Sequence, residues 1–461
     1  MVEEKIKTNN CFILWNYQID FTGRGDTAFY DPDKKQLNVN NNLFGGIFGL
    51  ADYTKGFAFT KDSYTPNGDV GIFRVSDIDD ILNFNELARV DFNFWDKYNN
   101  FRIKPLDIIM TVTGNTVGKC FLMPADIPKM LMNQNAMILR AKENVDAYFL
   151  YSFFLTDYFK NEVKVRAHSG TRPFLDLIFF QKIQLPTLNL TQKEKIKTIV
   201  KNNLSLKESA EQEYKKAKTI LDKELKNYLN TVKKDKTFIK WSDVINWTER
   251  LDPFFYFENE YEKNASEYIT LGDFADVLIG KTPAYDDYIK SGCRILKFRA
   301  IRGNGLDWIN EERAFVRDEL AKKYKNKLER DDIVLGCAAH QASYIGSKID
   351  VVDYIPAGLK NVLTVAEIMS IKTARELNPY VLLLFLRSQV GYELIQRQVK
   401  GQTSHLYPKD VKQIKLPKKL LPLSQSDSGK EIERLIKSSL QKKREAKERL
   451  EEAKNFVENL L

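Results

Sequence analysis

Two stretches of the chain place hydrophobic residues alternately four and three positions apart, with Lys, Glu and Arg between them. The first stretch, 191–230, contains neither Gly nor Pro, and the second begins at Lys430. The seam residues are Ala210, Tyr214, Ala217, Leu221 and Tyr228 in the first stretch, and Ile432, Ile436, Ala446, Leu450, Ala453 and Val457 in the second. This spacing is typical of coiled coils and predicts long spacer helices over 191–230 and 426–461. Because the chain must return between them, we expect them to pack antiparallel.

The rest of the chain contains short apolar runs bounded by Gly and Pro. DIIMTV (107–112) and DIVLGC (332–337) predict strands, because they are short and rich in β-branched residues. Apolar stretches over 144–163 and 377–399 predict buried helices. Each series ends in an I-x-L-P strand, whose Pro is expected at the exit from a sheet.

These elements occur twice in the same order. Residues 169–186 and 400–417 share a Gly, an apolar residue and I-x-L-P at one offset of 231, and 103–114 align with 328–339 at an offset of 225. We interpret the chain as α+β, with two similar mixed α/β globular domains separated by the two antiparallel coiled-coil helices in a pseudo-twofold internal repeat. The predicted domains are 1–190 and 231–425.

The composition argues against a membrane-spanning, a secreted or a metal-binding protein. Apolar residues make up 43% and charged residues 29%, and no apolar run approaches the ~20 residues of a membrane span. The N-terminus is polar and acidic where a signal peptide is basic and then apolar, so we expect a cytoplasmic protein. Four scattered Cys and three His lack the short spacing of a metal site. The net charge of +9 favours an acidic partner without establishing one.

With these motifs in this order, the chain resembles the specificity (S) subunit of type I restriction–modification systems. The likeness rests on ERLDPFFYF (249–257), LGDFADVLIGKTPAYDDYIKSGCRILKFRAI (271–301), DIIMTVTGNTVGKCFLMPAD (107–126) and the paired I-x-L-P exits into Lys/Glu-rich helices. It spans nearly the whole chain. The first forty residues fit least well, and CAAHQASYIGSK (337–348) departs from the family's pattern.

The resemblance implies a division of labour between this chain and its partners. Each domain would read one half of a bipartite, asymmetric site in double-stranded DNA. The helices would set the spacing between the halves and dock two methyltransferase (modification) subunits and, through these, restriction subunits. S-adenosylmethionine, ATP and Mg²⁺ would be bound by the partner subunits, and this chain would bind no cofactor or metal and perform no catalysis.

Polar loops of both domains carry side chains that suit DNA. Arg hydrogen-bonds guanine, Asn or Gln adenine, and Ser or Thr either, whereas Lys and Arg also hold phosphates. Taken singly, each such residue could equally be a solvated charge or a capping group. The candidate DNA-binding residues are Arg74, Ser76, Thr113, Asn115, Thr116, Lys119, Arg166, His168, Ser169, Thr171, Arg172, Arg299, Arg302, Asn304, His340, Gln341, Ser343, Lys348, Thr403, Ser404, His405 and Lys409.

Two motifs suggest chemistry but depart from the required pattern. GNTVGKC (114–120) has three residues between its glycines where a phosphate loop has four, and Cys120 follows Lys119 where Ser or Thr would bind magnesium. LDPFFYF (251–257) lacks the second Pro of the adenine-methyltransferase motif that it resembles. The alternatives are therefore a non-enzymatic scaffold that binds protein through its paired helices and, less favoured, a stand-alone enzyme.

Overall fold

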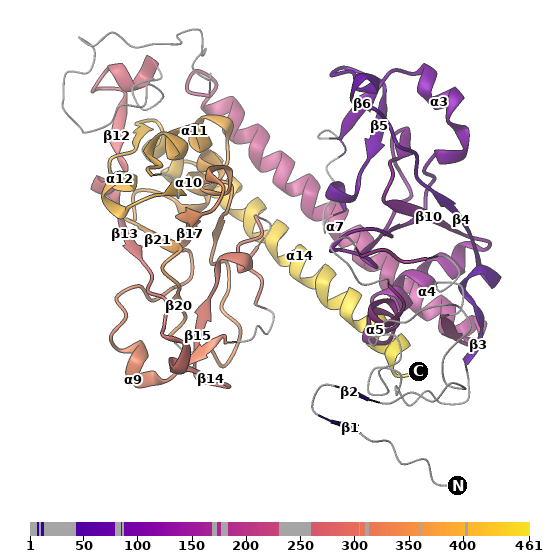
Figure 1. The fold of residues 1–461 in the computed structure, drawn as a ribbon. Helices are drawn as coiled ribbons and strands as arrows, with labels where there is room; N and C mark the ends of the chain where they lie inside the picture. Colours follow the sequence, from indigo (N-terminus) through magenta and orange to yellow (C-terminus); the bar gives the residue numbers. More distant parts are fainter. Residues whose placement is uncertain are drawn as a thin grey trace. The chain divides into compact units, whose positions relative to one another are not determined.

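The computed structural model describes residues 7–8, 11–12, 43–78, 84, 87–167, 173–176, 183–229, 260–303, 305–308, 313–359, 361–401 and 404–461. The Asp-Pro motif at 252–253 lies outside these residues. The chain divides into two compact units: Met1–Lys207 with Glu445–Leu461 (unit 1), and Glu208–Arg444 (unit 2). Each long helix therefore contributes one part to unit 1 and the other part to unit 2 (Figure 1).

Unit 1 is built on a four-stranded antiparallel sheet. Its strands, in spatial order, are β4 (Ala51–Lys55), β10 (Ala136–Ala141), β7 (Ile108–Thr111) and β8 (Cys120–Leu122). A second sheet has the order β6 (Ala88–Val90), β5 (Val70–Phe73) and β9 (Met130–Met132), with β5 and β9 parallel. The other strands and α-helices that the structure describes before the long helix are β1 (Lys7–Thr8), β2 (Cys11–Phe12), β3 (Leu43–Gly46), α3 (Asn93–Lys97), α4 (Asn144–Phe154), α5 (Asp157–Arg166) and β11 (Gln184–Pro186), of which β11 pairs with β3.

Unit 2 repeats this topology. Its main sheet has the order β13 (Ala275–Ile279), β21 (Ile368–Thr373), β17 (Ile333–Gly336) and β19 (Ile349–Val351). Its second sheet contains β14 (Tyr288–Ile289), β16 (Phe315–Val316), β15 (Cys293–Leu296) and β20 (Leu363–Thr364), with β15 and β20 parallel. The other elements are β12 (Tyr268–Thr270), α8 (Leu271–Phe274), α9 (Asp318–Ala321), β18 (Ala338–Ala339), α10 (Pro379–Leu386), α11 (Gln389–Gln398), β22 (Ser404–His405), α12 (Pro408–Lys412), β23 (Lys415–Pro417) and α13 (Leu420–Gln425).

The two units agree in detail as well as in strand order. Asp107 and Asp332 are both buried before the equivalent strands β7 and β17, and each accepts a backbone N–H from three residues earlier. Asp107 pairs with Arg140 on β10, and Asp332 pairs with Lys372 on β21. The predicted strands at 107–112 and 332–337 and the mixed α/β character are confirmed.

Each buried helical stretch is broken where the sequence predicted continuity. The stretch at 144–163 consists of α4 and α5, because Thr156 leaves the helix and its hydroxyl accepts the N–H of Phe159 as an N-cap. In unit 2, Ser388 separates α10 from α11, and its hydroxyl accepts the backbone N–H of Gly391 as the N-cap of α11. Helix α4 contacts β8 and β10, and α10 contacts β19. Both helices are buried on nearly all sides.

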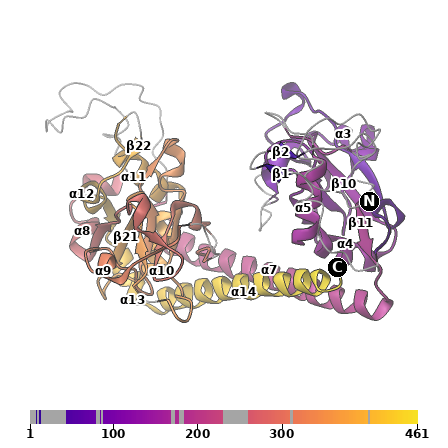
Figure 2. The same cartoon turned by 60° about the horizontal axis from the view of Figure 1, so that its bottom comes forward.

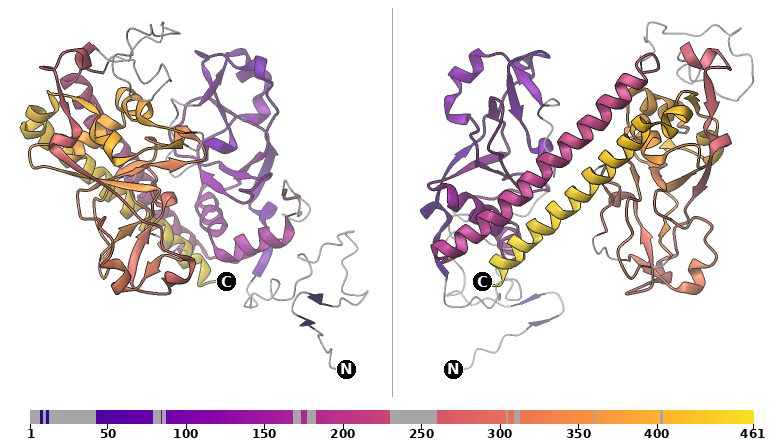
Figure 3. Two further views of the ribbon diagram at one scale, coloured as in Figure 1. Left: turned by 60° about the vertical axis from the view of Figure 1, so that its left-hand side comes forward. Right: turned by 180° about the vertical axis from the view of Figure 1, so that it is seen from behind.

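The long helices are α7 (Leu190–Glu224) and α14 (Asp427–Glu458). Within each unit they lie side by side and antiparallel (Figures 2 and 3). In unit 1, Lys195 lies over the ring of Phe456, and in unit 2 the Ser428 hydroxyl bonds the carboxylate of Glu224. None of the helices in the described part of the chain is long and apolar enough to span a membrane.

The predicted seam residues fall into three groups. The buried ones are Ala210, Ala217, Leu221, Ile432, Ile436, Ala446, Ala453 and Val457. Tyr214 and Leu450 are half-buried. Tyr228 lies beyond the end of α7 in a turn, where its hydroxyl donates to Glu267 and its ring packs on Tyr261.

Candidate nucleic-acid interface

Two loops of unit 2 that are far apart in sequence meet through a short strand pair. Strand β18 pairs with β22, so that Ala338 lies opposite His405. A turn at Gly401, which has a φ of 84°, returns the chain so that Lys400 and His405 bond each other's backbones. Because the pairing is antiparallel, the residues that follow β18 continue past Ser404, away from the segment that follows β22, whereas Leu406 lies beside Cys337 and donates its backbone N–H to the carbonyl of Cys337. Of the sequence-predicted residues, the pairing brings His340, which directly follows β18, close to Ser404 and His405 of β22. Gln341 and Ser343 lie further along the first segment, and Lys409 lies further along the second.

Two exposed tyrosines belong to these same loops, and sequence reasoning missed them. Tyr407 is 46% exposed and stacks on His405 with ring centroids 6.4 Å apart. Tyr344 is 47% exposed in the loop after β18. Aromatic side chains held at a surface offer flat faces on which nucleic-acid bases stack. The signals in the sequence were the polar residues around both tyrosines and the Pro that follows Tyr407.

Unit 1 brings the equivalent loops together by an isolated bridge. Thr113 pairs with Phe174, and the backbone N–H of Gly114 donates to the carbonyl of Pro173 at 2.7 Å. Phe174 takes the place that His405 has in unit 2 and is 44% exposed. Asn115 and Thr116 are exposed in the adjoining turn. The candidates His168, Ser169, Thr171, Arg172, Asn304 and Thr403 lie outside the described residues.

Several predicted cations already have acidic partners in their own unit. Arg74 forms two hydrogen bonds with Asp77, which outweigh burial and raise the pKa of the guanidinium. Arg166 pairs with Glu162 at 2.6 Å, and Arg302 with Asp307 at 3.4 Å. Paired guanidiniums of this kind are less available to phosphates, because binding DNA would first require breaking the pair.

The remaining predicted residues occupy other parts of the two units. The Lys119 ammonium donates to the carbonyl of Ile78, which connects the loop after β7 to the turn holding Arg74 and Ser76. Lys348 directly precedes β19, as Lys119 precedes β8. Arg299 is exposed in the turn after β15. Ser404 is buried because it lies inside the β18–β22 pair, so it is not a surface contact.

Buried polar side chains connect α7 and α14. In unit 1, Asn203 is fully buried and donates to the carbonyl of Ala446. In unit 2, the hydroxyl of Ser439 donates to the carbonyl of Ala210. Asn203 and Ser439 lie 236 positions apart, as do Ala210 and Ala446, so the two contacts are equivalent in the repeat.

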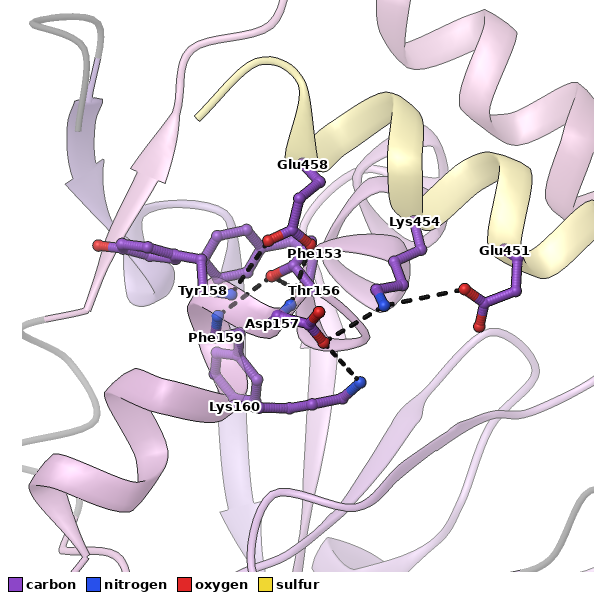
Figure 4. A network of polar contacts seen from close by, with 9 residues as sticks. All are labelled: Phe153, Thr156, Asp157, Tyr158, Phe159, Lys160, Glu451, Lys454 and Glu458. Carbon is purple, nitrogen blue, oxygen red and sulfur yellow. Dashed lines mark hydrogen bonds and ion pairs between the residues drawn. The ribbon is translucent and has the colours of Figure 1, made fainter. Parts of the chain in front are cut away.

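The end of α14 caps a helix of unit 1 (Figure 4). The Glu458 carboxylate accepts the backbone N–H groups of Asp157 and Tyr158 at the start of α5. Lys454 and Lys160 both pair with Asp157 at 3.2 Å. Burial alone would raise the pKa of Asp157, but these two ammonium groups outweigh it and hold the pKa below its usual range. Acidic groups are favourable at a helix N-terminus, so α14 stabilises α5 directly.

The described residues contain no group of three or more His, Cys, Asp or Glu side chains placed to hold a metal ion.

Comparison with known proteins identifies one domain. Residues 45–219 match the family described as "Type I restriction modification DNA specificity domain". None of the curated proteins matches the chain.

Solved structures of type I systems align over most of the chain. The S subunit of a type I restriction–modification system from M. genitalium is 16% identical, with 92% of this chain and 98% of that chain covered and a TM-score of 0.45. The HsdS subunit from Thermoanaerobacter tengcongensis is 11% identical, with 92% and 97% covered and a TM-score of 0.28. A chain from a study of complex assembly and conformational transition of the type I R-M system is 14% identical, with 92% and 97% covered and a TM-score of 0.29.

The matched residues contain the main sheet of unit 1, α4, α5 and most of α7. Residues 45–219 of this chain therefore form a domain of the type I restriction modification DNA specificity family.

Proposed function

We propose that this chain is the DNA sequence-specificity subunit of a type I restriction–modification enzyme and that each unit reads one half of a bipartite, asymmetric DNA site. The match at residues 45–219 to a DNA specificity domain supports this role for unit 1. The same strand order in unit 2 extends it to the second half of the chain.

The observation that carries the proposal is the equivalent loop pair in each unit. The pairing Thr113–Phe174 and the pairing Ala338–His405 present side chains from two distant segments at one place. In the segments joined by these pairings, unit 1 carries the amide of Asn115, the hydroxyl of Thr116 and the ring of Phe174. The corresponding segments of unit 2 carry different groups, namely the imidazoles of His340 and His405, the amide of Gln341 and the phenols of Tyr344 and Tyr407. Because different donors and acceptors match different base edges, the two half-sites would differ in sequence.

The long helices would set the gap between the half-sites and dock two modification subunits. Their buried Asn203 and Ser439 contacts support a fixed register between them, since a slip would leave buried polar groups unpaired. S-adenosylmethionine would be used by the modification subunits, and ATP and Mg²⁺ by restriction subunits docked through them. This chain would contribute recognition without catalysis, in the cytoplasm.

Selection of bound duplexes from a random pool, using the full chain, tests the proposal. We expect two short, unlike sequences separated by one fixed gap, and retention that weakens steeply with salt because Lys and Arg displace counterions from phosphates. Duplexes that are retained without any salt dependence, or not at all, would contradict it and favour a protein-binding scaffold.

A further inference from the structure

A cavity of about 420 Å³ opens in unit 1 between the loop after β7, α5 and the long helices. Its floor is apolar, with Phe121, Phe154 and Val163 among its lining residues. Sites that hold small molecules are typically of this size and are mostly apolar with a few polar groups.

The charged residues that line the cavity are all cationic, and Thr116, Cys120 and Tyr151 add uncharged polar groups. Four lysines, Lys119, Lys160, Lys164 and Lys207, line it, and none of the lining residues is Asp or Glu. Lys160 also pairs with Asp157, which is outside the lining (Figure 4). Four ammonium groups around an apolar floor favour a ligand that carries negative charge on an apolar body.

At the same place in unit 2, two side chains of α11 bond the loop after β18. Tyr392 stands where unit 1 has Lys160, since α11 begins 232 positions after α5. Its hydroxyl donates to the carbonyl of Ser343. Gln396 stands where unit 1 has Lys164, and it donates to the carbonyls of Ala342 and Ile345. Through these hydrogen bonds, Tyr392 and Gln396 hold the loop after β18 against α11.

An ion pair occupies the deeper part of the equivalent place. Arg387 pairs with the fully buried Asp350 at 2.9 Å, and it also donates to the carbonyl of Ile349. Unit 1 has Leu155 and Phe121 at the corresponding positions, so it lacks both the charges and the contacts. The open space in unit 1 therefore accompanies both these side-chain differences and a shorter loop, since β7 and β17 are 225 positions apart whereas β8 and β19 are 229 apart.

We propose that this cavity is a binding site for a small amphipathic anion, a molecule with one carboxylate or phosphate on an apolar body of about ten carbons. The apolar body would lie on Phe121, Phe154 and Val163, and the anion would lie among the lysines. This inference does not depend on the proposed DNA recognition, because it rests on the geometry of unit 1 alone.

Isothermal titration of the full chain tests the site with three probes. Decanoate should bind with one site per chain, decyltrimethylammonium at least about tenfold more weakly, and inorganic phosphate not measurably, because each control probe lacks one of the two features. Equal affinity for decanoate and decyltrimethylammonium, or no binding of decanoate, would overturn the proposal.

Variants that place the residues of unit 2 at the equivalent positions of unit 1 test whether the ligand binds in this cavity. Lys160→Tyr with Lys164→Gln should weaken decanoate binding at least about tenfold by filling the cavity and removing two charges. Lys104→Gln with Lys201→Gln removes two charges from exposed positions of unit 1 outside the lining and should leave the affinity unchanged. Should the first variant unfold, Lys164→Gln alone, at an exposed position, should still weaken binding several-fold. Affinity equal to the unmodified chain in the folded variant would refute the assignment.

Discussion

The side-chain amide of Asn203 donates a hydrogen bond to the backbone carbonyl of Ala446 at 2.6 Å, joining α7 to α14 inside unit 1. Both residues are fully buried. The amide oxygen of Asn203 has no hydrogen-bond partner within the described residues, so the contact carries a desolvation cost as well as a gain. A buried polar side chain between two paired helices is suited to specifying the register of one helix against the other.

Asn203→Ala should lower the free energy of unfolding of unit 1 by about 1–3 kcal/mol, because the buried contact and its packing are both lost. Urea unfolding followed by fluorescence measures this. Asn202→Ala, at an exposed neighbouring position, is the matched control and should change stability by less than about 0.5 kcal/mol. If both variants unfold at the same urea concentration, the contact contributes nothing.

Lengthening both helices should widen the gap in the DNA site. One heptad inserted after Lys207 and one after Arg444, where the chain passes between the units, preserves the seam and adds about 10 Å to each helix. The preferred gap should grow by about three base pairs while both half-sites keep their sequences. Selection from random duplexes provides the measurement. A heptad in α7 alone mismatches the pair and should instead lower the thermal unfolding temperature; an unchanged gap in the double insertion would refute the spacing role.

Removing one exposed aromatic ring should weaken the binding of one DNA half-site and leave the binding of the other unchanged. Tyr407→Ala should reduce affinity through the half-site of unit 2, and Phe174→Ala through that of unit 1, each by about 1–3 kcal/mol if the ring stacks on a base. Competition with duplexes altered in one half at a time separates the effects. Tyr285→Ala, at a residue 68% exposed outside both loops of unit 2, should change neither. Equal weakening of both halves by one ring variant would contradict the assignment of one unit to one half.

Salt dependence should distinguish a phosphate contact from a base contact. Lys409 is exposed at the start of α12, beside the loop pair of unit 2. Lys409→Gln should lower the slope of log affinity against log salt by about 0.9 and weaken all sequences alike. Gln341→Ala should leave that slope unchanged and relax the preference at one base pair. If Gln341→Ala lowered the salt slope and Lys409→Gln changed the base preference, Lys409 would contact a base and Gln341 a phosphate.

Because of Lys443, the free energy of unfolding should increase as the pH is raised above about 8. Burial, with the nearby charge of Arg387, lowers the pKa of this ammonium group to about 8. Between about pH 8 and the unfolded value of about 10.4 the unfolded chain binds more protons, so stability rises with pH across that window. Below pH 8 the group is charged in both states, and its burial destabilises the protein.

Lys443→Met should therefore raise stability at pH 7 by on the order of 1–3 kcal/mol and flatten the rise above pH 8. Urea unfolding at pH 7, 8, 9 and 10 measures both effects. Lys447→Met, at an exposed position one turn later on α14, should follow the pH profile of the unmodified chain. An unaltered profile in Lys443→Met would show that the group titrates normally.

Helix and strand positions were predictable because their signals are local. The four-three spacing of Ala210, Ala217, Ala446 and Ala453 predicted buried faces of long helices, and those side chains are buried. The end of α7 was not predictable from spacing, since Tyr228 continues the pattern after the helix has stopped. The break between α4 and α5 had a local signal in Thr156, but the uninterrupted apolar run around it concealed the cap.

The sequence by itself determined that the chain contains one mixed α/β unit twice and where its long helices and a few of its strands lie, because a repeat and a periodicity are visible in the order of residues alone. Tertiary structure alone decided which loops meet: Thr113 reaches Phe174, and Ala338 reaches His405, across long separations in the chain. It also decided that one place in the repeat is a cavity in unit 1 and an Arg387–Asp350 ion pair in unit 2. The physical reason is that such contacts depend on how complete sheets and helices pack, and no short window of sequence contains both partners.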